Sequence, residues 1–117
     1  MRLNEVTYPN AKPVEGYGPG FFRIGGKVYD GALLVLPNGQ VSWGGYEDTA
    51  PIREAKDTID VLFIGTGAEI AHIPAALRNT LEDAGIGVEV MSSPSACRTY
   101  NVLLSEGRRI ALAVLPV

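Results

Sequence analysis

The chain has 117 residues, of which 46% are hydrophobic and 20% are charged, and this composition is typical of one globular domain. Its formal net charge of −3 argues against bulk binding to nucleic acid or to an anionic membrane, since both require a basic surface. One cysteine, Cys97, excludes an intrachain disulfide and a cysteine-based zinc site. We therefore expect a single domain over residues 1–117 with no cofactor and no metal.

The N-terminal segment favours irregular structure and a cytoplasmic location. Residues 1–20 contain three prolines and three glycines, which predicts an irregular N-terminal arm rather than a helix. The segment shows neither the apolar core of a signal peptide nor the pattern of a transit peptide. Apolar runs in the chain also fall short of the ~20 residues that span a bilayer. The use of a single cysteine fits a reducing cytosol.

The first half of the chain predicts mainly β structure. Gly25-Gly26 separates two apolar segments, which is a hairpin signal. Residues 32–36 are apolar at consecutive positions, so this strand is expected to be buried on both faces. The expected elements are a strand at 21–24, one or two strands within 27–37, a turn at 37–39, a strand at 40–43 and a short helix near 51–56.

The second half alternates strands and helices. In the first helix Leu77, Leu81 and Ala84 share one face, and Gly85 ends it. Ser93-Pro94 predicts the start of the second helix, with Ser93 as N-cap and Pro94 at the first helical position. The expected elements are a strand at 60–64, a helix at 74–84, a strand at 86–91, a helix that starts at 93 and ends at Gly107, and a final buried strand within 108–117.

This alternation predicts an α/β fold in three layers, because strand–helix–strand units form right-handed crossovers onto one sheet. We expect a mixed, mostly parallel sheet with two main helices. The helices are expected on one face, with the N-terminal strands either adding to the sheet or covering the other face.

The strand that ends in Gly65, Thr66 and Gly67 (the glycine loop) and precedes a helix has the order found in many phosphate-binding sites. A dinucleotide fingerprint needs a third glycine at position 70, which is isoleucine, and a Walker A loop needs a lysine here. Both motifs are absent. The loop either binds an anion at the carboxyl ends of the strands or is a tight turn that needs positive φ.

Two reactive residue types occur once each. His72, between the glycine loop and the first helix, is either a general base or anion contact, or a surface or capping residue. Cys97 lies in the first turn of the second helix, where the helix dipole lowers a thiol pKa. The chain gives it no adjacent base, so a small buried thiol is favoured over a nucleophile. We expect no catalytic residue.

The segment CRTYN at 97–101 places Arg98 and Asn101 on one helix face and turns Tyr100 toward the sheet. If this helix starts beside the glycine loop, one cleft suits an anionic group. The alternative is that Asn101 fastens a neighbouring segment and that Arg98 is a solvated charge. The candidate ligand-binding residues are Gly65, Thr66, Gly67, Ser93, Arg98 and Asn101.

Three motifs together resemble a known family of small domains: the strand followed by GTG, the A-x-x-T-Y-N pattern at 96–101 and E-G-R at 106–108. The family includes the mitochondrial complex I assembly factor 3 and the adipogenesis-associated single-domain protein. The resemblance runs from about Tyr8 to Val117. It implies a three-layer α/β domain with a cleft near the glycine loop, and it implies no established catalysis. The absence of a targeting extension predicts a bacterial-type cytoplasmic member.

Two functions follow as hypotheses. The first is a non-enzymatic interaction protein, an assembly factor for respiratory complex I or another membrane-associated complex, whose surface includes Phe21, Trp43 or Tyr46. The second is a protein or enzyme that binds a small anionic ligand at the glycine loop. We expect protein partners such as respiratory complex subunits, no nucleic acid, no membrane span, and a monomer or weak homodimer.

Overall fold

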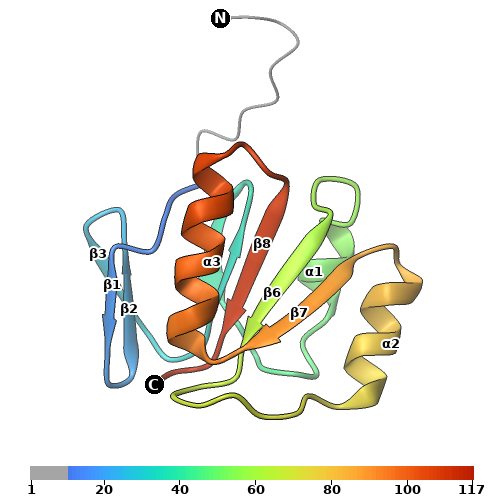
Figure 1. The fold of residues 1–117 in the computed structure, drawn as a ribbon, viewed down its shortest axis with the longest axis horizontal. Helices are drawn as coiled ribbons and strands as arrows, with labels where there is room; N and C mark the ends of the chain where they lie inside the picture. Colours follow the sequence, from blue (N-terminus) through green and yellow to red (C-terminus); the bar gives the residue numbers. More distant parts are fainter. Residues whose placement is uncertain (1–10) are drawn as a thin grey trace, which may run out of the picture.

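A computed structural model describes residues 11–117 of the protein, and Figure 1 shows its fold. The elements expected from residue 21 onward are confirmed in type and order. In chain order they are β1 (Gly16–Gly18), β2 (Phe21–Ile24), β3 (Lys27–Asp30), β4 (Leu33–Leu36), β5 (Gly39–Ser42), α1 (Ala50–Glu54), β6 (Val61–Gly65), α2 (Ala75–Asp83), β7 (Gly87–Met91), α3 (Ser93–Ser105) and β8 (Ile110–Val114).

The N-terminal strands form a separate three-stranded antiparallel sheet in the order β1-β2-β3. Gly25 and Gly26, with φ of +60° and +79°, make the expected two-residue hairpin turn, since such a turn needs positive φ at both positions. The expected irregular arm over residues 1–20 is wrong at β1, which pairs with β2. The part of that prediction that concerns residues 1–10 lies outside the described residues.

The main sheet has five strands in the order β5-β4-β8-β6-β7. It is mixed rather than mostly parallel: β6 pairs in parallel with β7 and β8, whereas β4 pairs antiparallel with β5 and β8. The consecutive apolar residues of β4 are buried because both faces of the sheet are covered, and that pattern does not depend on strand direction.

The three-layer arrangement is confirmed, but the two long helices lie on opposite faces of the main sheet (Figure 1). Leu77 and Leu81 of α2 pack on the face formed by Leu62 and Ile64, together with α1. The other face carries α3 and the small sheet. The expectation of both helices on one face is wrong because β7 lies on one side of β6 and β8 on the other. Right-handed crossovers in opposite directions place their helices on opposite faces.

The start of α3 differs from the expected start by one residue. Ser92, not Ser93, is the N-cap, and its hydroxyl accepts a hydrogen bond from the Ser95 N–H at 3.4 Å. Ser93 is thereby the first helical residue, and its fully buried side chain turns toward the sheet. This shift directs the Ser93 hydroxyl to the glycine loop.

Candidate functional site

The glycine loop and the start of α3 meet at the carboxyl ends of β6 and β7. The Gly67 N–H donates to Ser93 Oγ at 2.9 Å, and the Ser93 N–H donates to the Gly67 carbonyl at 2.7 Å. Ser93 Oγ also donates to the Leu115 carbonyl at 2.6 Å, just after β8. The Leu115 N–H donates in turn to the Gly65 carbonyl at 2.9 Å. We call these contacts of Gly65, Gly67, Ser93 and Leu115 the clasp, since they join the ends of β6 and β8 to α3.

The clasp occupies the place where many open α/β sheets bind a ligand. The loop after β6 leads to α2 on one face, and the loop after β7 leads to α3 on the other, so the crevice between them is a topological switch point. Here the Thr66 N–H donates to the Met91 carbonyl at 2.9 Å, and the Gly67 N–H is bonded to Ser93. These two amides of the glycine loop are therefore bonded within the protein.

Both glycines of the loop are needed, for different reasons. Gly67 has φ of +109°, a conformation that favours glycine, as the tight-turn alternative requires. Gly65 faces the start of α3, and an added Cβ would lie 2.7 Å from Ser93 Cα and 2.8 Å from Val114 Cγ1. Close approach of the helix to the strand therefore excludes any side chain at position 65.

Thr66 holds the far side of the loop. Its hydroxyl donates to the Glu69 carbonyl at 2.8 Å and accepts from the Ala71 N–H at 3.0 Å. This side chain–backbone pattern is typical of a compact turn. The four candidate residues Gly65, Thr66, Gly67 and Ser93 thus lie together, as expected.

Arg98 and Asn101 make contacts away from the glycine loop. Asn101 accepts from the Val14 N–H at 2.8 Å through Oδ1 and donates to the Val14 carbonyl at 2.9 Å through Nδ2. It fastens the segment before β1, which is the alternative role expected from the sequence. Arg98 is exposed and donates to Ser95 Oγ at 3.2 Å. Ligand binding by the six candidate residues as a set stays a prediction.

Cys97 is buried among the side chains between α3 and the main sheet, with 3% of its surface exposed. Burial raises the pKa of its thiol from 9.0 to about 12, and the nearby Arg98 charge only partly opposes this. Burial likewise raises the pKa of Tyr100. A protonated, enclosed thiol is a poor nucleophile, so the geometry matches the small buried thiol expected from the sequence.

The Cys97 pKa predicts how stability depends on pH. Above pH 9 the thiol ionises in the unfolded chain but stays protonated in the folded protein until about pH 12. The folded state then binds more protons, so the free energy of unfolding should fall by up to about 1.4 kcal/mol per pH unit from this group. Urea unfolding at pH 8 to 11 should show a steeper fall in wild type than in Cys97→Ala. The same pH dependence of the free energy of unfolding in both proteins would contradict the raised pKa of Cys97.

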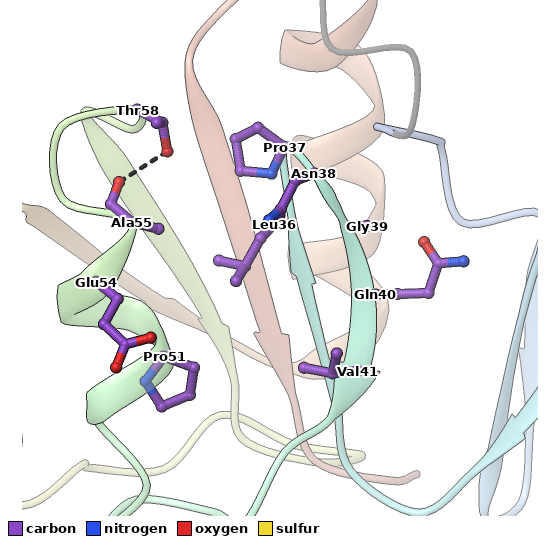
Figure 2. A pocket seen from close by; sticks show the side chains of 10 residues that line it. All are labelled: Leu36, Pro37, Asn38, Gly39, Gln40, Val41, Pro51, Glu54, Ala55 and Thr58. Atoms are coloured by element: carbon purple, nitrogen blue, oxygen red, sulfur yellow. Dashed lines mark hydrogen bonds between the residues drawn. The ribbon is translucent and has the colours of Figure 1, made fainter.

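Two of the cavities formed by residues 11–117 lie outside the clasp. One, of about 510 Å³, lies between β5 and α1, where Leu36 and Val41 face Pro51, and the side chain of Gln40 points away from it (Figure 2). The other, of about 350 Å³, lies between the loop that follows the glycine loop, α2 and β7. His72, an exposed residue, and Arg78 both line this second cavity.

The second cavity was missed in the sequence because its lining residues come from three separate elements. The sequence pattern indicates only that Arg78 lies on the solvent side of an amphipathic helix and that Val90 lies in a strand. The one local signal is Ile70, a large apolar side chain in a loop, which is 67% exposed. Among residues 11–117, no group of three or more His, Cys, Asp or Glu side chains is placed to hold a metal ion.

Residues 14–115 match the family model described as "Protein of unknown function (DUF498/DUF598)". The chain belongs to this family. An uncharacterised protein of Rhodobacter capsulatus is 47% identical over 100% of this chain and 94% of its own length. NADH dehydrogenase [ubiquinone] 1 alpha subcomplex assembly factor 3 of Danio rerio is 34% identical over 88% of this chain. The resemblance to the family that includes this assembly factor is confirmed.

Solved structures of similar chains have the same fold. A crystal structure described as an outer membrane protein from Bartonella henselae is 36% identical, with a TM-score of 0.85 over 93% of this chain and 98% of that one. A Mth938-like domain from Bordetella pertussis is 25% identical, with a TM-score of 0.74 over 99% and 91%. The present chain spans 63% of the length of the Danio rerio assembly factor. No helix within residues 11–117 is long and apolar enough to cross a membrane.

Proposed function

We propose that this DUF498/DUF598 protein is a non-enzymatic assembly factor that binds subunits of NADH dehydrogenase or of another membrane-associated complex. The observation that carries the proposal is the 34% identity to the Danio rerio assembly factor across 88% of this chain. The match covers the folded unit rather than one short motif, so the two proteins have most of that unit in common.

The chemistry of the buried polar residues supports binding over catalysis. The Ser93 hydroxyl both donates and accepts within the clasp, so it is not available as a nucleophile. The Cys97 thiol is enclosed, and its raised pKa keeps it protonated. Ser93 and Cys97 are therefore buried parts of the fold rather than reactive groups.

Of the three aromatic residues expected on the contact surface, Phe21 and Tyr46 are partly exposed and Trp43 is buried. Trp43 is 5% exposed, stacks edge-on against Tyr46 with ring centroids 5.9 Å apart, and donates through Nε1 to the Asp48 carbonyl. The expectation that Trp43 is an exposed contact is wrong. Within residues 11–117, the large apolar side chains that are exposed lie on the small sheet, on β5, in the loop before α2 and on α3: Tyr17, Val28, Val41, Ile70 and Val102.

Affinity capture tests the proposal. The tagged chain, expressed at its native level, is recovered from membranes and cytosol of its own host, and an unrelated acidic domain with the same tag serves as control. Mass spectrometry should identify NADH dehydrogenase subunits, or subunits of one other membrane complex, in constant ratio to the tagged chain. Recovery at the level of the control domain would contradict the assembly role.

A further inference from the structure

The cavity between the loop before α2, α2 and β7 (the loop–α2 groove) combines an apolar wall with the polar side chains of His72 and Arg78. Its lining residues are Ile70, Ala71, His72, Ile73, Arg78 and Val90. Among the described residues that line it there is no carboxylate, so its polar groups are hydrogen-bond donors suited to an anion.

Arg78 is already held in place at this groove. Its Nη1 donates to the Val88 carbonyl and to Glu82 Oε2, each at 3.3 Å, and 40% of its side chain is exposed. Both contacts use Nη1, so among the described residues Nε and Nη2 of Arg78 have no hydrogen-bond partner and can donate to an additional carboxylate. The exposed Ile70 lies at the same opening.

The groove lies along an open strand edge. β7 is the last strand of the main sheet and pairs only with β6. The Gly87 N–H and the Met91 carbonyl bond toward the β6 side, so the alternation of a parallel strand turns the backbone groups of Val88 and Val90 outward. Arg78 covers the Val88 carbonyl. In the described part of the chain, the outward N–H and C=O of Val90 have no partner.

We propose that the loop–α2 groove binds an extended segment of a partner polypeptide that carries an acidic side chain next to an apolar one. The peptide backbone bonds to Val90, the carboxylate meets Arg78 and the His72 imidazole, and the apolar side chain covers Ile70. An unpaired strand edge recognises a backbone, which a small anion lacks, so a peptide uses the whole groove. The identity of the partner rests on the proposed function, whereas the binding itself does not.

Selection of random 12-residue displayed peptides against the full chain tests this inference. Enriched peptides should carry Asp or Glu beside Val, Ile or Leu, and a synthetic copy should shift the amide NMR signals of Val90 and residues 70–73. Arg78→Gln should weaken binding about fivefold to tenfold, and Arg23→Gln, which removes an exposed arginine from β2 of the small sheet, should leave it unchanged.

Four results would overturn the inference: no enriched peptide, enriched peptides without acidic residues, equal binding by wild type and Arg78→Gln, or shifts confined to other surfaces. Displacement of the peptide by hexanoate at equal concentration would assign the groove to small carboxylates and would also overturn it. If acidic peptides bind here but capture recovers no membrane-complex subunit, the groove assignment stands and the assembly role falls.

Discussion

Replacing Gly65 by alanine is expected to lower the free energy of unfolding by about 3 kcal/mol, which is the upper part of the range for overpacked sites. The new Cβ would lie 2.7 Å from both Ser93 Cα and Ser93 Oγ and 2.8 Å from Val114 Cγ1. Two of these contacts involve the backbone of α3 and a fully buried core side chain, so the clasp has to open before the methyl group fits.

The measurement is urea unfolding followed by circular dichroism, with Gly16→Ala as the matched control. Gly16 also lies in a strand, its φ is not positive, and an added Cβ meets nothing within 4 Å. The control should change stability by no more than about 0.5 kcal/mol. If Gly65→Ala were as stable as Gly16→Ala, the close packing of α3 on β6 would be contradicted.

Replacing Ser93 by alanine is the second large expected effect, again about 3 kcal/mol. The substitution leaves the Gly67 N–H and the Leu115 carbonyl without the hydroxyl that bonds both. Each buried polar group left unpaired costs about 1–3 kcal/mol, and Ser93 itself is fully buried. The loss of volume is small, so the hydrogen bonds account for most of the effect.

Ser105→Ala is the control for this second prediction. Its hydroxyl donates to the Val102 carbonyl at 2.6 Å within the last turn of α3, but the side chain is exposed and water replaces the contact. Thermal unfolding should therefore show a large decrease in Tm for Ser93→Ala and almost none for Ser105→Ala. Equal Tm values for the two variants would show that the clasp does not stabilise the fold.

The sequence was sufficient for the order of elements because local patterns determine them. Gly25-Gly26 between apolar segments predicts the hairpin, and Gly85 and Gly107, both with positive φ, follow α2 and α3. The faces occupied by the helices could not be read in this way. They follow from the position of β8 on the far side of β6, which is a pairing between distant segments and leaves no periodic signal in either strand.

The candidate site was predictable only in part for a similar reason. The sequence predicts that the glycine loop and Ser93 lie close together, because parallel neighbouring strands end at the same edge of a sheet, and the structure places them there. The hydrogen-bond partners of these polar groups include atoms from the end of β8 and the residues after it, such as the Leu115 carbonyl. No sequence motif specifies these partners. The groove beside Arg78 combines a loop, a helix and a strand edge, so it becomes visible only in the folded chain.

The most direct test of the assembly role is a native-gel measurement of NADH dehydrogenase in host cells that lack the gene, with and without the wild-type gene restored. The proposed function predicts less mature enzyme and an accumulation of partial assemblies, both reversed by the restored gene. A normal amount of mature enzyme in the deleted cells, with no partial assemblies, would contradict a role for this protein in building NADH dehydrogenase.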